Sequence, residues 1–338
     1  RNSVSTAILM CIDPDIPHNE GCLQHIEVSA PKGTVVNAEW PAPTAAATIV
    51  PADTITDSVW KCLAQAIPEK AVAGCGHVTP NCVTTGVDRR DPDVEKPFGV
   101  ILFNGSSGGG ASAVSDGWPF MVTPGTVGGL CFAPIEIIEM HFPLVVREYQ
   151  VRTDSMGAGK NSGGPGLNFI LTPRGTGQID NYGYGDGMTN PPFGLYGGLP
   201  GDGGALYREN ADGTKLVVSA LSYFRVSEGE LWCAIATGGG GYGDPLERDP
   251  AKVAANTRDE FISQEMATDI YGVVFGAGDF AIDLAATEQR RAKLRGDRTI
   301  VEIDPSVPGA ATYYRSLVGP NDVYALNPRP PEDADATL

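Results

Sequence analysis

The sequence predicts an α+β fold in which a β-rich, irregular sheet scaffold with many glycine and proline loops precedes a helical C-terminal segment. The 338 residues include 43 glycines and 27 prolines without collagen periodicity, which is typical of many turns between short strands. Short β-prone runs alternate with glycine clusters up to residue 235, and helix-capping residues follow residue 244. We therefore expect three regions: an N-terminal α/β segment (1–97), a β-rich glycine-loop core (98–243) and a helical C-terminal segment with an acidic tail (244–338).

The N-terminal region begins with a predicted helix over residues 2–12. The chain opens on RNSVSTAILMCI without an initiator methionine, so we expect this helix to continue from an N-terminal portion that lies elsewhere. Two prolines and a glycine in 13–21 end the helix. Residues 25–37 then predict a strand, a turn at Pro31-Lys32-Gly33 and a second strand.

The clearest early helix is predicted over residues 53–69. Asp53 or Thr54 caps its start, and Pro68 ends it. The spacing of apolar residues predicts that one face is buried. That face consists of Ile55, Val59, Cys62, Leu63 and Ala66.

The core region is predicted to consist of short strands. Val146, Glu148 and Gln150 alternate imperfectly with their neighbours in 144–152, which indicates a half-buried strand. Strands do not alternate with helices in this region, so a parallel nucleotide-binding sheet is not expected. The predicted strands are 99–103, 144–152, 167–172, 216–221 and 231–236.

The C-terminal region predicts three helices. Asp249 followed by Pro250 begins the first, and Ser263 begins the second, which ends before Gly272. The third covers residues 283–296. The final residues, 327–338, have the composition of a flexible acidic end.

Charge and cysteine content exclude several classes of protein. The net charge of −17 repels phosphate backbones, so nucleic acid is not an expected partner. No apolar run approaches the roughly 20 residues that span a bilayer, and no signal peptide is present, so we expect no membrane association. The seven cysteines form no CxxC pair, which favours reduced thiols in a cytoplasmic protein over disulfides or a metal cage.

The glycine clusters do not match known phosphate-binding motifs. The run GAGKNSGGPG at 157–166 contains Lys160, but Asn161 follows it where a P-loop has serine or threonine, and a strand follows where a P-loop has a helix. The cluster at 238–244 is interpreted either as a tight connection of several turns or as a segment whose glycines let a ligand or another polypeptide approach the backbone.

Four residues are candidates for acid–base chemistry: His18, His25, Asp116 and His141. The histidines of the chain, which also include His77, form no HxxxH or HExxH pair, so no metal ligand is assigned. Asp116 lies in a glycine-rich loop, where an exposed carboxylate is available for catalysis. The alternatives are structural histidines and an Asx turn at Asp116.

Several segments together resemble one family. They are 16-IPHNEGCLQHIEVSAPKGTVVN-37, 134-PIEIIEMHFPLVVREYQVRTDSMGAGKNSGGPGLN-168, 192-PFGLYGGLPG-201 and the run from 238-GGGGYGDP to IYGVVF-275. The chain resembles the C-terminal portion of the B-type subunit of the ATP-dependent hydantoinase/5-oxoprolinase family, to which acetone and acetophenone carboxylase subunits are related.

The resemblance implies a division of labour between subunits. An A-type subunit with bound ATP and Mg²⁺ phosphorylates the substrate carbonyl, and the B-type subunit opens the ring. It also implies a divalent metal held by the N-terminal half of the B-type subunit. Asn19, Lys160, Gly163 and Gly164 are then candidates for binding the substrate, with Lys160 as a counter-charge to phosphate, although the arginine usual in this stretch of the family is absent.

Three functions fit the resemblance. The chain belongs to an amidohydrolase of hydantoin-like or lactam substrates, to an ATP-dependent ketone carboxylase, or to a non-catalytic scaffold of a larger assembly. The amidohydrolase is the leading hypothesis and the carboxylase the runner-up, because the phosphorylated carbonyl serves both enzymes equally. The lack of a local acid–base or metal motif is the feature that supports the scaffold.

Overall fold

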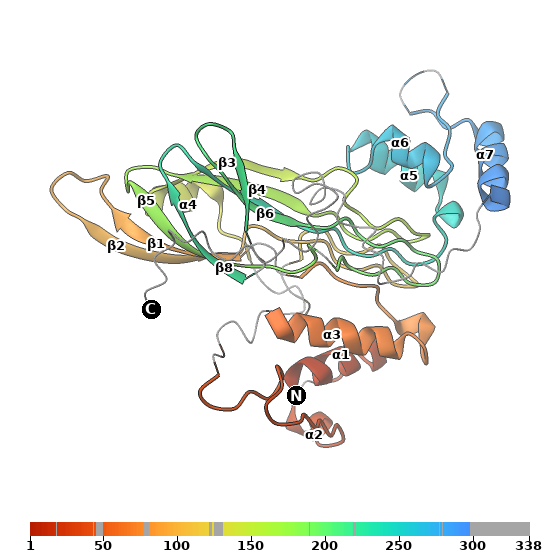
Figure 1. Cartoon of the computed structure of the whole chain (residues 1–338). Helices are drawn as coiled ribbons and strands as arrows, with labels where there is room; N and C mark the ends of the chain where they lie inside the picture. The colour runs from red at the N-terminus through yellow and green to blue at the C-terminus, as the bar shows by residue number, and fades with distance from the viewer. Residues whose placement is uncertain are drawn as a thin grey trace.

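The computed structural model describes residues 1–297 except 18, 43, 45–49, 78–80, 122–123, 125–130, 189, 219–220, 277 and 279. Two antiparallel sheets occupy one end of the molecule, and extended segments run on from them toward the other end (Figure 1). N-terminal helices lie along one side of these segments, and C-terminal helices lie at the far end (Figure 1). The fold is therefore α+β, as the sequence predicts.

The two sheets pack face to face around the main hydrophobic core. The strands are β1 (Asn81–Asp88), β2 (Lys96–Leu102), β3 (Leu144–Val151), β4 (Leu167–Pro173), β5 (Gln178–Tyr184), β6 (Ala205–Glu209), β7 (Lys215–Val217), β8 (Leu221–Ser227) and β9 (Leu231–Ile235). Their order is β2-β1-β5-β8 in one sheet and β3-β4-β9-β6-β7 in the other, with every neighbouring pair antiparallel. Phe224 of the first sheet contacts Trp232 of the second, with ring centroids 4.3 Å apart.

Strand β3 explains the imperfect alternation in its sequence. Its register against β4 shifts between Val146 and Glu148, which marks a β-bulge. A bulge adds one residue and reverses the inward–outward pattern beyond it. Strands β1, β5, β6 and most of β8 were not predicted, and the predicted strand 216–221 is divided between β7 and β8.

The N-terminal helices are α1 (Asn2–Ile12), α2 (Glu20–Leu23) and α3 (Val50–Leu63), followed by a 3₁₀ turn, η1 (Pro68–Lys70). Helix α1 has the predicted bounds. The predicted hairpin at 25–37 is wrong, because this stretch contains only one bridge, between Thr34 and Asn37. The predicted start and end of the next helix, 53–69, are also wrong. Helix α3 begins at Val50, so Asp53 lies inside it, and it ends at Leu63, well before Pro68.

The buried face of α3 differs from the predicted apolar face. Asp53, Thr56, Asp57 and Trp60 are buried, whereas Cys62 of the predicted face is exposed. Trp60 packs toward α1, where its Nε1 donates to the carbonyl of Ala7 at 3.2 Å. Of the buried polar residues, Asp57 accepts from the N–H of Cys75 in the extended segments, whereas the Thr56 hydroxyl lies 3.5 Å from the carbonyl of Ser3 in α1.

The C-terminal helices confirm the capping predictions. They are α5 (Pro250–Arg258), α6 (Gln264–Asp269) and α7 (Leu284–Asp297), preceded by the 3₁₀ turn η3 (Pro245–Glu247), while the short helix α4 (Ile135–His141) leads into β3. The Asp249 carboxylate accepts from the N–H of Ala251, and the Ser263 hydroxyl accepts from the N–H of Met266. The predicted tail at 327–338 lies outside the described residues. Within the described part of the chain, no helix has both the length and the apolar character needed to cross a membrane.

The extended segments form what we call the glycine bundle: residues 73–76, 105–111, 157–166, 192–201 and 237–243. The last of these lies at its centre and hydrogen-bonds to four other segments, whereas a strand within a sheet bonds to two neighbours. Gly239 donates to Gly164, and Gly240 donates to Gly74, with N···O distances of 2.9 and 2.8 Å. Gly240 and Gly241 accept from the N–H groups of Ala111 and Leu195.

Close approach of backbones explains why these segments contain glycine. A Cβ on Gly108 would lie 1.8 Å from the carbonyl oxygen of Gly164, and one on Gly239 would lie 1.9 Å from that of Gly109. No side chain fits such a gap, because real Cβ contacts are essentially never under 3.0 Å. The interpretation of 238–244 as a tight connection of several turns is therefore wrong: residues 238–241 are buried, and their N–H groups donate to distant segments instead of closing turns.

Candidate functional site

Asp116 lies where the glycine bundle meets the C-terminal region. Its two carboxylate oxygens accept from Nη1 and Nη2 of Arg248 at 2.6 and 3.0 Å, and one also accepts from the N–H of Ser162 at 2.8 Å. The Arg248 side chain is only 2% exposed. Burial disfavours the charged carboxylate, but hydrogen bonds and charge from Arg248 outweigh it and lower the pKa of Asp116. Asp116 thus holds a buried arginine against the bundle.

The predicted substrate-binding residues of 157–166 have different surroundings. Lys160 is exposed, and its Nζ lies 3.7 Å from a carboxylate oxygen of Glu247. Gly163 and Gly164 are buried in the glycine bundle, where their N–H groups donate to the carbonyls of Gly157 and Gly109. Their amides are therefore already used within the protein, and Lys160 is the member of this set that faces solvent.

The other predicted residues lie elsewhere in the fold. His25 is exposed just after α2, Asn19 caps that helix by accepting from the N–H of Cys22, and His141 is exposed at the end of α4. His18 lies outside the described residues. In the part of the chain that the structure describes, no hydrogen bond or ion pair joins His25, Asp116 and His141 to one another. The structure does not bring the described candidates together into one site.

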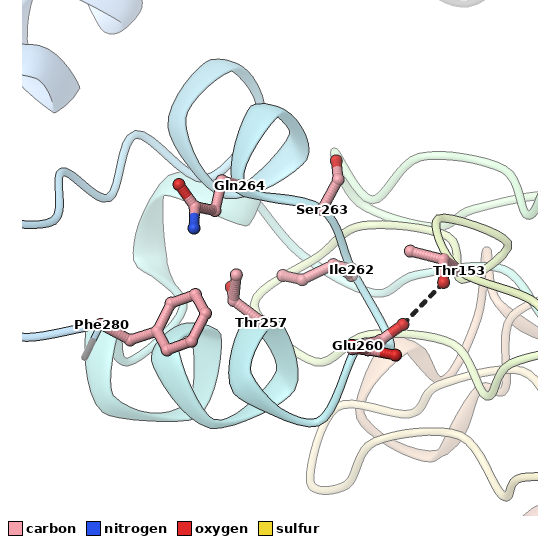
Figure 2. Close-up of a pocket in the computed structure, with 7 residues that line it drawn as sticks. All are labelled: Thr153, Thr257, Glu260, Ile262, Ser263, Gln264 and Phe280. Atoms are coloured by element: carbon pink, nitrogen blue, oxygen red, sulfur yellow. Dashed lines mark hydrogen bonds between the residues drawn. The ribbon is translucent and has the colours of Figure 1, made fainter. Parts of the chain in front are cut away.

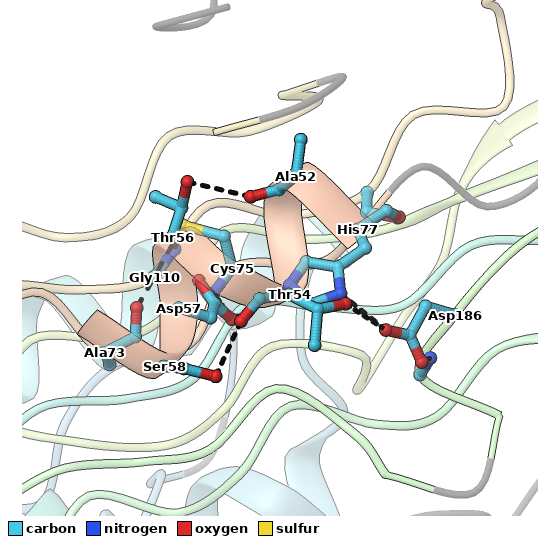
Figure 3. A network of polar contacts seen from close by, with 12 residues as sticks. Ala52, Thr54, Thr56, Asp57, Ser58, Ala73, Cys75, His77, Gly110 and Asp186 are labelled. Atoms are coloured by element: carbon cyan, nitrogen blue, oxygen red, sulfur yellow. Dashed lines mark hydrogen bonds and ion pairs between the residues drawn. The ribbon is translucent and has the colours of Figure 1, made fainter. Parts of the chain in front are cut away.

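A cluster centred on His77 was not predicted. His77 Nε2 lies 3.0 Å from a carboxylate oxygen of Asp57 on α3, and Nδ1 lies 2.7 Å from one of Asp186, which follows β5 (Figure 3). Thr54, one turn before Asp57 on α3, donates its hydroxyl to the same Asp186 oxygen at 3.3 Å. The Asp57 carboxylate also accepts from the N–H of Cys75 at 3.2 Å. We call Asp57, His77 and Asp186 the histidine–aspartate trio.

The trio runs from the interior toward solvent. The side chains of Asp57 and His77 are 9% and 12% exposed, and that of Asp186 is 31% exposed. Burial lowers the pKa of His77, but the charge of Asp57 and the hydrogen bonds to both carboxylates prevail and raise it well above its usual value. Burial raises the pKa of Asp57, whereas His77 overcomes burial and lowers that of Asp186. Burial, followed by the charge of Asp57, also raises the pKa of the Cys75 thiol, which makes it a poor nucleophile.

The metal-binding capacity of these groups is limited. The described ranges contain no group of three or more His, Cys, Asp or Glu residues arranged to hold a metal ion. In the trio, both ring nitrogens of His77 face carboxylate oxygens, so neither presents a lone pair outward. The residues described here do not fit the divalent metal that the resemblance implies.

Two surface cavities lie away from these clusters. One of about 260 Å³ lies between the start of α6 and the residues before it, where Thr153 donates its hydroxyl to the carbonyl of Glu260 (Figure 2). Another of about 620 Å³ lies beside the β6–β7 hairpin and includes Arg147 and Asp212 in its lining. Neither contains a predicted site residue or a member of the trio.

The fold and these clusters define a class: an antiparallel sandwich joined to a glycine bundle, with charged pairs where helices meet the bundle. The chain belongs to the hydantoinase B/oxoprolinase family, whose model matches residues 1–245. The predicted family is thereby confirmed.

Several relatives are described as enzyme subunits. The chain is 34% identical over 299 residues to the beta subunit of the caprolactamase of Pseudomonas jessenii, covering 86% of this chain and 51% of that protein. It is 29% identical over 300 residues to the B-type subunit of a putative D-/L-hydantoinase of Pseudomonas sp. (strain NS671), covering 82% and 45%. The crystal structure of the ATP-dependent caprolactamase from Pseudomonas jessenii superimposes with a TM-score of 0.73 at 31% identity, covering 86% of this chain and 50% of that one. The chain thus spans about half the length of these relatives.

Proposed function

We propose that this chain forms part of the B-type subunit of an ATP-dependent amidohydrolase that opens hydantoin-like or lactam rings. The observation that carries the proposal is its 34% identity, over 86% of the chain, to the beta subunit of a caprolactamase. The similarity extends through the sandwich and the glycine bundle, so the chain supplies a framework of the same kind.

The chemistry explains why such an enzyme uses ATP. A ring amide carbonyl is a poor electrophile, and phosphorylating its oxygen turns that oxygen into a leaving group. Water attacks the activated carbon, the C–N bond breaks as the ring nitrogen takes a proton, and a second water displaces phosphate from the resulting acyl phosphate. A lactam then gives an amino acid and a hydantoin gives an N-carbamoyl amino acid, each with ADP and inorganic phosphate. Orientation in a closed cavity supplies much of the remaining acceleration.

The glycine bundle supports the assignment of ATP to a partner polypeptide. Binding a phosphate group requires free backbone N–H groups that converge on the anion. In the bundle, the amides of Gly163, Gly164 and Gly239 donate to carbonyls instead. We place ATP and Mg²⁺ on an A-type subunit and a divalent metal on the N-terminal half of the B-type subunit, in a cytoplasmic complex whose thiols stay reduced.

Reconstitution tests this function. The chain is combined with a matching N-terminal half and an A-type subunit, and ring opening of caprolactam and hydantoin is measured with phosphate release. We expect ring opening that requires ATP and every polypeptide. Ring opening without ATP, or turnover only of a ketone with bicarbonate, would overturn the proposal. Undiminished activity without this chain would do the same.

A further inference from the structure

The histidine–aspartate trio joins two parts of the fold that are distant in sequence. Asp57 lies on α3, 20 residues before His77, and Asp186 follows β5, 109 residues after it. His77 itself continues directly from the bundle segment 73–76. Figure 3 shows Asp57 and Thr54 on the α3 side of the ring and Asp186 on the other. The trio therefore spans the boundary between α3 and the glycine bundle.

The contacts of His77 with Asp57 and with Asp186 each require a proton between nitrogen and oxygen. An ionised carboxylate only accepts hydrogen bonds, and neutral imidazole has a single N–H. Two carboxylates that flank one imidazole at 2.7 and 3.0 Å therefore need one proton more than two aspartates and a neutral histidine possess. Whether that proton resides on His77 or on Asp57, its loss leaves two lone pairs facing each other.

We propose that the trio is a proton-dependent clamp that docks α3, with α1 packed on it, onto the glycine bundle. The bundle is rich in glycine, so it offers α3 only a few apolar side chains, among them Cys75, which packs with Trp60. The face of α3 turned toward it carries Asp53 and Asp57, both buried. Charged hydrogen bonds supplement the small apolar cluster that contains Trp60 and Cys75 at this boundary, and these hydrogen bonds hold only while the extra proton is present.

The pKa directions define the range in which the clamp is closed. The pKa of His77 is raised, so its contribution is complete below the usual histidine value and is lost as pH rises through the folded value. The pKa of Asp186 is lowered, so its contribution is complete above the usual aspartate value and is lost as pH falls through the folded value. Among the described residues, Asp53 on α3 and the Cys75 thiol on the bundle segment are further ionisable groups close to the trio, and both are buried.

Hydrogen–deuterium exchange of the full chain tests the clamp. His77→Gln removes the charge and one ring donor, and it should speed exchange of α1 and α3 amides roughly 100-fold, as expected for breaking a buried charged pair. Peptides from β4 and β9 should not change. His25→Gln, at an exposed histidine, and Ser58→Ala, on the exposed side of α3, are matched controls and should leave α3 protection intact.

A second arm varies pH in the unmodified chain. Exchange of α3 relative to β9 in the same sample should accelerate at high pH, and His77→Gln should abolish that dependence. If His77→Gln does not fold, Asp186→Asn, at the partly exposed end, should produce a smaller loss of protection at α3. Equal α3 protection in the unmodified and variant chains, or an α3-to-β9 ratio that is constant with pH, would overturn the proposal.

Discussion

Substituting Gly163 by alanine tests whether the glycine bundle is held together by backbone contact. The new Cβ would lie 1.9 Å from the carbonyl oxygen of Gly239 and 2.4 Å from its carbon. Reaching the 3.0 Å limit of real contacts requires the two segments to separate by 3.0 − 1.9 = 1.1 Å. That shift would weaken the neighbouring bonds from Gly157 to Gly239 and from Gly239 to Gly164, now 2.8 and 2.9 Å.

The expected cost combines two effects. Overpacking costs about 1–3 kcal/mol, and buried hydrogen bonds that are lost without replacement cost about 1–3 kcal/mol each. With both hydrogen bonds lost, we therefore expect Gly163→Ala to lower the free energy of unfolding by about 3–9 kcal/mol, measured by urea denaturation with tryptophan fluorescence.

Two other glycines provide a graded control for that measurement. A Cβ on Gly99 in β2 would lie 3.5 Å from Thr85 Cγ2, an ordinary contact, so Gly99→Ala should be neutral or slightly stabilising. A Cβ on Gly86 would lie 2.9 Å from the ring of Phe98, a side chain that can move, so its cost should be intermediate. A folded Gly163→Ala chain within about 1 kcal/mol of the unmodified protein would refute the backbone-contact argument.

Three further substitutions test the charged groups. Asp116→Asn should lower the free energy of unfolding by about 2 kcal/mol at neutral pH, because Arg248 stays buried without its charged partner. The pKa of Asp116 is lowered by folding, so this deficit should shrink as the pH falls below 3.8, the usual aspartate pKa, and urea midpoints measured across pH would show it. Lys160→Ala removes an exposed ion pair and should change the free energy of unfolding by less than about 0.5 kcal/mol. In the reconstituted enzyme, an increased KM would support a role of Lys160 in substrate binding, and unchanged KM and kcat would exclude that role. Arg152→Met should cost about 3–5 kcal/mol, because Arg152 donates to the carbonyls of Gly203 and Ala236 and pairs with Asp202 while only 8% exposed; a thermal midpoint equal to that of the unmodified chain would contradict this.

Local signals in the sequence were sufficient for the capped helices. Asp249 and Ser263 each bond to a backbone N–H two or three residues later, so the whole cap lies within one short window. A short stretch of sequence is not sufficient to predict strand β1. Its sequence NCVTTGVD lacks a clear apolar face because Gly86 and polar residues interrupt the apolar ones. Its pairing with β5 depends on residues almost 100 positions away, such as Thr84 with Asn181.

The glycine bundle and the trio are not encoded locally. Gly108 meets Gly164 and Gly239, and nothing in the spacing of glycines distinguishes such mutual packing from turns. For the trio, one signal was present: Asp53 and Asp57 fall on one face of a predicted helix, and a histidine follows in a glycine-rich stretch. The expectation of an apolar buried face obscured it, because α3 also buries the carboxylate of Asp57 against His77 and the N–H of Cys75.

The high glycine content of the bundle limits the apolar area that other elements can bury against it. Apolar side chains stabilise an interface in proportion to the area they remove from water, and glycine contributes little of that area. Elements that dock on the bundle therefore have only small apolar clusters there, such as Cys75 with Trp60 and Ala158 with Val253, and use its carbonyls and charged groups as well. Tyr242 donates to the carbonyl of Pro68 at the end of the α3 region, Arg248 pairs with Asp116 on the opposite side, and His77 joins α3 to the loop after β5. Because such contacts depend on protonation and geometry more than on area, the helical layers should respond to pH and to single substitutions before the sandwich does.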